Sequence, residues 1–430
     1  MTGAPRVVRR GLRVARHRAT TAHLGSAYPF PAEAGLGGRG VYLGTNVLTG
    51  GGGFAYDPFE AYAAGIVTNP NLLLAGEPGV GKSATAKTFV YRSVAVFGRW
   101  VAIADPKGEY RPLADALGLT VIDLHPGGTT RINPLDAGPS PSGDGDEQAR
   151  RQTAMVTALI GSVLRRDLTQ PEDALVAYAI THLTRHTRST PPATLAELVD
   201  VMRHPPEGMR TAPGIDTAQL AVDGTAATFA LTKLLDRSLR GMFDGPTTIS
   251  LDWSGPGVVI DLSAVHHDPD ALTLVMVATT GWLQAMLARP DGPPRIQVLD
   301  EAWALLGSER TARYLQSCWK LSRAYGVANM AIVHRLSDLR AQADDGTATS
   351  KVAAGLLADT QTRVLFRQST DQIADARALL GLTTTEAELL PRLARGRALW
   401  KIAGRSAVVA HHIGPTEYGF CDTDARMHAQ

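Results

Sequence analysis

The chain has 430 residues, of which 44% are hydrophobic and 20% are charged, and its formal net charge is +2. This composition is typical of a soluble globular protein, and the length exceeds one ordinary core, so we expect a large core with an insert or appendage. The two cysteines, Cys318 and Cys421, lie too far apart in the sequence to form a metal-ligand pattern, and they fit a reducing cytoplasm.

The first part of the chain, residues 1–50, is expected to be a basic, Gly-rich arm. No acidic residue precedes Glu33, and no apolar stretch follows the arginines, which excludes a secretory signal. A basic arm can contact nucleic acid or anionic lipid head groups, or it can be solvated without a partner. The arginines before Glu33 are Arg6, Arg9, Arg10, Arg13, Arg16 and Arg18.

Short apolar runs alternate with helical patterns from about residue 70 onward. Strands are expected at residues 71–76, 100–105 and 120–124, and a helix between the first two is expected to end near residue 97. This alternation predicts an α/β protein with a mostly parallel sheet and helices on both faces.

Only helical patterns, interrupted by Pro and Gly, occupy residues 147–242. We therefore expect an all-helical insert over residues 138–245, which divides the core into a first part, 51–137, and a second part, 246–430. The apolar stretch 271–288 has a borderline length for a membrane span, but Thr, Gly and Gln interrupt it, so we expect a buried core helix. The strands expected in the second part are 247–252, 257–263, 295–300, 328–333, 362–368 and 398–404.

The sequence GEPGVGKS at residues 76–83 matches the P-loop pattern completely, between an apolar strand and a helix. Its glycines let the backbone bend so that N–H groups point toward phosphate, and the helix N-terminus adds a partial positive charge. Lys82 would contact the β and γ phosphates of ATP, and the Ser83 hydroxyl would bind Mg²⁺. A chance Gly-rich turn is the alternative, which the strand and helix context disfavours. The residues expected to bind ATP are Gly76, Glu77, Pro78, Gly79, Val80, Gly81, Lys82, Ser83 and Ala84.

An acidic pair ends the apolar run RIQVLDEAW at residues 295–303. Asp300 would lie at the carboxyl end of a strand, where open α/β sheets hold their ligands. We expect Asp300 to hold Mg²⁺, directly or through water, and Glu301 to orient and polarise the attacking water. A surface Asp-Glu pair without a role is the alternative.

Two more polar segments follow strands. In DPKGEY, at residues 105–110, the dipeptides Asp-Pro and Lys-Gly suit a simple turn, while the position favours a role beside the nucleotide. His334 ends the strand at 328–333, where a polar residue can sense the γ-phosphate or serve only structure. Arg323 ends the preceding helix, where an arginine is usually a solvated charge.

The motifs GEPGVGKSA, DPKGEY, RINPLD, GMFDGPT, LDEAW and GRALWKIAGR occur in this order. Together they resemble the ATPase half of type IV secretion and conjugation proteins, the VirB-four or TraC-like members of the HerA–FtsK superfamily. The resemblance runs from about residue 20 to the C-terminus, and the Arg-rich and Ala-rich text is similar to actinobacterial members.

This resemblance implies a RecA-like core with an all-α insert, assembled as a homo-hexameric ring with ATP between subunits. Lys82 and Ser83 match the family's Walker A pair, and Asp300 and Glu301 match Walker B. Arg323 matches the arginine finger that reaches a neighbour's γ-phosphate. The large N-terminal domain with which longer members dock to membrane components is not expected here.

The function implied is an ATP-hydrolysing motor or energiser of type IV secretion or conjugal transfer, cytoplasmic and peripheral at the inner face of the membrane. ATP and Mg²⁺ would be its cofactors, membrane-embedded channel components its partners, and protein or a DNA–protein complex its cargo. A DNA translocase of the FtsK or HerA type is an alternative that DPKGEY and GMFDGPT disfavour. A nucleotide-binding scaffold with little turnover is another: His334, where most of the family carries Gln, supports it, and Glu301 opposes it.

Overall fold

A computed structural model describes residues 39–48, 51–138, 145–186, 192–207, 209, 214–289, 292–306, 308–334, 355–356 and 360–421. The arginines of the predicted N-terminal arm, Arg6 to Arg18, lie outside the described residues.

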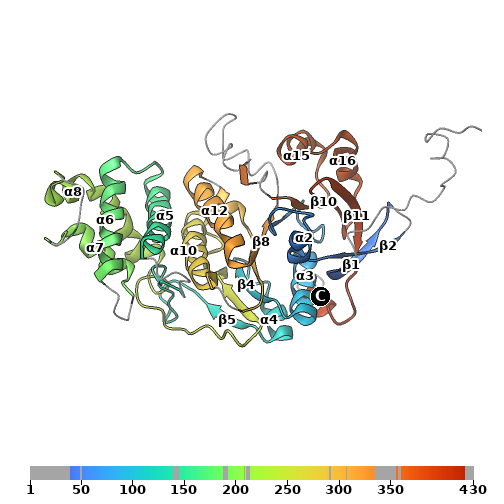
Figure 1. The fold of residues 1–430 in the computed structure, drawn as a ribbon, viewed down its shortest axis with the longest axis horizontal. Helices are drawn as coiled ribbons and strands as arrows, with labels where there is room; N and C mark the ends of the chain where they lie inside the picture. The colour runs from blue at the N-terminus through green and yellow to red at the C-terminus, as the bar shows by residue number, and fades with distance from the viewer. Residues whose placement is uncertain are drawn as a thin grey trace, which may run out of the picture.

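A single sheet organises the described part of the chain (Figure 1). It is 11-stranded, with the order β2-β1-β11-β10-β9-β3-β8-β7-β4-β6-β5. Pairing is parallel from β9 to β5 and antiparallel from β9 to β2. The strands are β1 (Val41–Asn46), β2 (Gly52–Tyr56), β3 (Leu72–Ala75), β4 (Trp100–Asp105), β5 (Thr120–Asp123), β6 (Gly257–Asp261), β7 (Arg295–Leu299), β8 (Val327–Val333), β9 (Thr362–Leu365), β10 (Arg397–Ile402) and β11 (Arg405–His411).

The central strands are buried on both faces, which explains why their sequences are runs of apolar residues. Successive residues of β3 enter opposite hydrophobic clusters: Leu72 and Leu74 pack on one face of the sheet, and Leu73 and Ala75 on the other. The first face carries α3 and α4, and the second carries α10 and α12. The main helices of the core are α2 (Pro58–Ala63), α3 (Lys82–Phe97), α4 (Arg111–Leu117), α10 (Pro269–Leu287), α11 (Trp303–Leu306), α12 (Glu309–Ser322), α15 (Ile373–Leu380), α16 (Thr384–Leu389) and α17 (Tyr418–Cys421).

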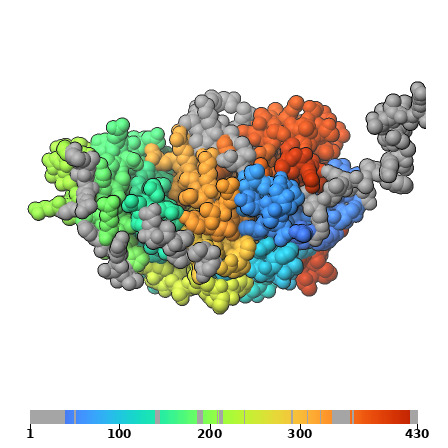
Figure 2. Space-filling model, in the orientation of Figure 1, coloured from blue at the N-terminus to red at the C-terminus, as the bar shows by residue number. Residues whose placement is uncertain are grey.

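A group of helices forms one end of the molecule, and the segment 360–421 lies toward the other end (Figures 1 and 2). Helix α5 joins this group to the core, because it packs on α6 and α9 and also on α10 and α12. The described residues between 145 and 238 form helices without strands, as the sequence predicts for the insert. The helices are α5 (Gly145–Leu164), α6 (Gln170–His186), α7 (Leu195–Arg203), α8 (Thr217–Asp223), α9 (Thr225–Lys233) and the π-helix η1 (Leu234–Ser238).

Helix α10 covers the apolar stretch predicted to be a buried core helix. Among the described residues it is long and apolar enough to cross a membrane by length and composition, yet most of it is buried inside the protein. It packs against α5, α11 and β4, so its apolar surface is used by the core.

The strand predicted at residues 247–252 is wrong. This segment instead hydrogen-bonds to the loop that precedes the helical group, because its threonines supply side-chain partners. The Thr248 N–H donates to the Arg131 carbonyl at 3.0 Å, and the Asn133 N–H donates to the Thr247 hydroxyl at 2.7 Å. Those contacts take the place of a sheet ladder.

Strands β1, β2 and β11 are not among the strands predicted from the sequence, and β1 lies within residues 1–50, where an arm is predicted. A glycine in β1, Gly44, permits close packing against β11. A Cβ atom at Gly44 would lie 1.9 Å from the Ala410 carbonyl oxygen, so only glycine lets β1 pair with β11 at this point. The predicted domain boundaries stay predictions.

Gly257 begins β6 with φ +148°, and a Cβ atom there would lie 2.0 Å from the Val101 carbonyl oxygen of β4. We expect Gly257→Ala to destabilise the fold by at least about 2 kcal/mol, because the β4–β6 pair must separate. Gly404→Ala is the matched control, since a Cβ there meets nothing within 4 Å. Urea unfolding of both variants tests this, and equal midpoints would contradict it.

Candidate functional site

The P-loop connects β3 to α3 at the carboxyl edge of the sheet. Gly79 and Gly81 have φ values of +74° and +109°, a left-handed region that favours glycine. Lys82 begins α3 and is only 4% exposed. Its ammonium donates hydrogen bonds to the carbonyls of Gly76 at 2.5 Å and Glu77 at 2.7 Å. The backbone carbonyls of the P-loop therefore bind the ammonium group of Lys82 in this structure.

The environment of Lys82 disfavours its charged form, because the ammonium group is buried away from water. Burial lowers the pKa of Lys82 to about 8, with a smaller lowering from the charge of Lys107, while Asp300 and Glu301 oppose the shift. An anion at this position would therefore gain from a concentrated and poorly solvated positive charge.

Asp300 follows β7 and is 1% exposed. Its Oδ1 accepts a hydrogen bond from the Glu301 N–H at 2.9 Å, whereas its Oδ2 is buried without a partner among the described residues. Burial, then the nearby charge of Glu301, raises the pKa of Asp300. A buried carboxylate oxygen with no donor fits a cation or its bound water. The Mg²⁺ site predicted at Asp300 and Ser83 stays a prediction.

Glu301 is held by donors on both carboxylate oxygens. Its Oε1 forms an ion pair with Lys107 and lies 2.6 Å from His334 Nε2, and its Oε2 accepts a hydrogen bond from the indole N–H of Trp303. Burial alone would raise the pKa of Glu301, but the hydrogen bonds and charges of His334 and Lys107 outweigh it and lower the pKa to about 2. The backbone of Glu301 has φ +54°, a left-handed conformation that is strained for this residue type.

The segment 105–110 is both a turn and a part of the site. Asp105 accepts hydrogen bonds from the backbone N–H groups of Lys107 at 3.2 Å, Glu109 at 3.1 Å and Tyr110 at 2.8 Å. Burial outweighs these bonds and raises the pKa of Asp105 to about 6. The turn fixes the backbone of Lys107 beside the acidic pair.

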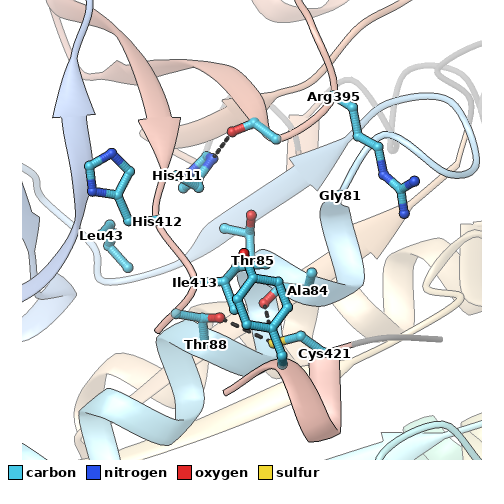
Figure 3. A pocket seen from close by; sticks show the side chains of 12 residues that line it. Leu43, Gly81, Ala84, Thr85, Thr88, Arg395, His411, His412, Ile413 and Cys421 are labelled. Atoms are coloured by element: carbon cyan, nitrogen blue, oxygen red, sulfur yellow. Dashed lines mark hydrogen bonds between the residues drawn. The ribbon is translucent and has the colours of Figure 1, made fainter. Parts of the chain in front are cut away.

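A cavity of about 380 Å³ adjoins the P-loop on the side of α3. Figure 3 shows Gly81 and Arg395 at one side of it, Leu43 and His412 at the other, and Thr85, Thr88 and Cys421 along its floor. Its walls therefore come from β1, the first turns of α3, the end of β11 and the C-terminal segment. The lining residues are Leu43, Gly81, Ala84, Thr85, Thr88, Arg395, Gly396, His411, His412, Ile413, Tyr418 and Cys421.

One arginine fastens the wall of this cavity. Arg92 of α3 donates to both carboxylate oxygens of Glu417, at 2.7 and 2.6 Å, and to the His412 carbonyl at 2.7 Å. His411 is fixed as well: its Nδ1 lies 3.1 Å from the Gly396 carbonyl, and its Nε2 accepts from Trp400 at 3.0 Å. Burial lowers the pKa of His411 to about 4, so this imidazole is neutral at pH 7.

The structure brings Lys82, Asp300, Glu301 and His334 together, but it places Arg323 elsewhere. Arg323 is exposed, and its guanidinium lies 3.4 Å from the carbonyl of Thr68, which precedes β3. It thus lies at the amino edge of the sheet, across from the P-loop of the same chain. The roles predicted for these residues remain predictions.

Sequence reasoning missed several residues of this region. Trp303 in LDEAW has no role predicted from the sequence, although an indole two residues after the acidic pair is the available signal. No role is predicted from the sequence for Arg92, Arg395 or Glu417 either. Their placement depends on pairing between distant segments, for which one sequence holds no signal.

No protein-family model matches the sequence, and a comparison with curated proteins finds no match. Solved structures do match. VirB4 of Thermoanaerobacter pseudethanolicus has a TM-score of 0.70 and 22% identity, over 89% of this chain and 98% of that one. The plasmid coupling protein TrwB with the ATP analogue ADPNP has a TM-score of 0.55 and 18% identity, over 80% of this chain and 85% of that one. TrwB with ADP and Mg²⁺ has a TM-score of 0.55 and 18% identity, over 80% of this chain and 86% of that one.

At these identities the likeness shows the fold. The RecA-like α/β core predicted from the sequence is confirmed, and the structural neighbours are of the kind that the sequence motifs resemble.

Because the Arg92–Glu417 pair is almost buried, with exposures of 16% and 5%, removing one partner strands the other charge. We expect Arg92→Ala to lower the free energy of unfolding by about 3 kcal/mol. The control is Arg165→Ala, whose partner Asp270 forms an exposed pair with it, at 77% and 79%, and this change should cost no more than about 1 kcal/mol. Denaturant unfolding compares the two, and similar losses would argue against the clamp.

Proposed function

We propose that this chain is an ATPase that binds ATP at its P-loop and energises macromolecular transport in a type IV secretion or conjugal transfer system. One observation carries the proposal: the buried Lys82, the unpartnered Asp300 Oδ2 and Glu301 meet at the carboxyl edge of a RecA-like sheet. The likeness to VirB4 over 89% of the chain supports the choice of system.

The phosphates of ATP would replace the carbonyl partners of Lys82. In the loop as it stands, the ammonium satisfies itself on Gly76 and Glu77. Phosphate oxygens offer the same geometry with full negative charge, and charge-assisted hydrogen bonds are stronger than neutral ones. Ser83 and Asp300 would hold Mg²⁺, which neutralises charge on the β and γ phosphates when bound.

The nucleoside would lie in the cavity beside α3. A P-loop places the γ-phosphate toward the acidic strand end and the rest of the nucleotide along the first turn of the following helix, here Ala84 and Thr85. The cavity begins at those residues, and its volume of about 380 Å³ falls in the range of small-molecule pockets. Arg395, which lies beside Gly81 in Figure 3, is placed to reach the phosphates or the ribose.

Hydrolysis needs a water held in line with the γ-phosphate. Glu301 is the group that would orient this water, and His334, 2.6 Å from it, is placed to link phosphate loss to the segment after β8. In this mechanism Lys82 would hold the phosphates directly and Asp300 would hold them through Mg²⁺. The protein would thus accelerate hydrolysis by positioning the reactants and by stabilising negative charge.

The assembly we propose is a homo-hexameric ring with ATP between subunits. Arg323 lies at the sheet edge across from its own P-loop, so in the ring we propose it would act on the ATP of a neighbour. We further propose a location at the inner face of the cell membrane, membrane-embedded channel components as partners, and protein, DNA or a DNA–protein complex as cargo.

The enzymatic proposal is tested by nucleotide binding and phosphate release. We expect Lys82→Ala to lose ATP binding, because the phosphate-binding charge is gone. Glu301→Gln should bind ATP and fail to hydrolyse it, because it keeps the size and loses the charge that orients water. Lys320→Ala, an exposed lysine on α12, is the control and should behave as the wild type. Normal turnover in both site variants would refute the assignment.

The shared site is tested by mixing two inactive variants. Arg323→Ala should bind ATP and lose roughly a thousandfold in turnover, as other arginine fingers do. Lys82→Ala alone should also be inactive. A mixed interface pairs an intact P-loop with an intact arginine, so phosphate release should partly return in the mixture. A mixture that stays inactive while both variants assemble would exclude Arg323 from this role.

A further inference from the structure

We propose that Lys107 is a positioning residue that withholds Glu301 in the nucleotide-free enzyme and moves to the γ-phosphate when ATP binds. This inference rests on the proposed ATPase function. It concerns a residue at the end of β4, outside both the P-loop and the acidic pair.

In the present arrangement, the two acceptor positions of Glu301 Oε1 are filled, so this oxygen cannot accept a hydrogen bond from a water molecule. Both carboxylate oxygens already accept hydrogen bonds, Oε1 from Lys107 and His334 and Oε2 from Trp303. A group that orients water needs a free acceptor position at hydrogen-bonding distance. The contacts with Lys107 and His334 therefore withhold Oε1 from water.

The contact between Lys107 and His334 shows that His334 Nε2 is the donor in its hydrogen bond to Glu301. His334 Nε2 lies 2.6 Å from Glu301 Oε1 and 2.8 Å from Lys107 Nζ. An ammonium has hydrogens to donate and no lone pair to accept with, so the Nε2–H of His334 must point to the carboxylate for both groups to be satisfied there. Lys107 and His334 thus share one carboxylate oxygen, and Lys107 can leave without stranding the other two groups.

Lys107 also lies in the electrostatic range of the phosphate position. Its charge lowers the pKa of Lys82, and it is drawn to both Asp300 and Glu301. Lys82 is the residue that would hold the γ-phosphate, so a phosphate bound there would also interact with the charge of Lys107. A γ-phosphate there offers more negative charge than a single carboxylate and competes directly for Lys107.

The backbone need not move for this exchange. Asp105 fixes the turn through three backbone N–H groups, including that of Lys107. Only the side chain of Lys107 has to swing from Glu301 toward the phosphate. Burial would lower the pKa of Lys107, but its contact with Glu301 raises it, so the side chain is charged when the phosphate arrives. With Lys107 gone, one acceptor position of Oε1 becomes available to water.

The variant Lys107→Met tests the exchange, with Lys401→Met as the matched control. Lys401 also forms a half-buried ion pair, with Glu386 on α16, and lies on β10 away from the site. We expect Lys107→Met to bind a non-hydrolysable ATP analogue 10-fold or more weakly with unchanged ADP affinity, and to lose kcat. Lys401→Met should lower only thermal stability. Lys107→Arg keeps the charge and should restore part of the preference for the ATP analogue.

A second measurement follows Glu301 directly and does not depend on activity. The indole of Trp303 donates to Glu301 Oε2, so 5-fluorotryptophan labelling reports the release of the carboxylate in the ¹⁹F NMR spectrum. The Trp303→Phe variant identifies the resonance among those of the 6 tryptophans. In the wild type this resonance should shift with the ATP analogue and Mg²⁺ and not with ADP and Mg²⁺. In Lys107→Met it should already be shifted without nucleotide.

The outcomes separate this inference from the function on which it rests. A wild-type chain that binds neither nucleotide overturns both. Binding of both nucleotides with the same ¹⁹F response, or a Lys107→Met variant that keeps the full preference for the ATP analogue, overturns only the role of Lys107. Should Lys107→Met fold poorly, the nucleotide dependence of the wild-type Trp303 resonance alone decides.

Discussion

The structure depends on one electrostatic constraint at the carboxyl edge of its sheet: charges that could not be buried singly are buried together. Lys82, Asp300 and Glu301 are each at most 4% exposed, with Lys107 half-buried beside them. An isolated charge in such a place costs several kcal/mol, and attraction between opposite charges offsets this cost only with well-made hydrogen bonds. The parallel strands bring the groups together because their carboxyl ends meet at one edge, so topology and electrostatics support each other.

The elements that could be predicted are those whose signal is local. The strands around Leu73, Ile103 and Val298 are buried on both faces, so their apolar text is continuous and easily recognised. The P-loop is set by glycine conformations and a helix start, which are also local. The same reasoning failed where side chains replaced the usual pairing. Thr247 and Thr248 look like strand residues, yet their hydroxyls and backbone pair with a loop.

What could not be predicted depends on contacts between distant segments. That Lys107 holds Glu301 follows from the neighbouring positions of β4 and β7 in the sheet, which no spacing in the sequence encodes. Gly44 of β1 shows no pairing signal in the sequence, and its close strand contact becomes evident only beside β11. A single sequence names the candidates for a site more readily than it names the groups that restrain them.

The cavity beside α3 has walls from both ends of the described chain, Leu43 near the start and Cys421 near its end. The residues that line the cavity are therefore synthesised at different times, with Leu43 early and Cys421 late. The P-loop leaves the ribosome long before the segment that closes the cavity, so a nascent chain can present the phosphate loop for most of its translation without a complete pocket beside it. Completion of the pocket is then coupled to synthesis of the segment that contains Glu417, because Arg92 has no Glu417 to bind until that segment has been made.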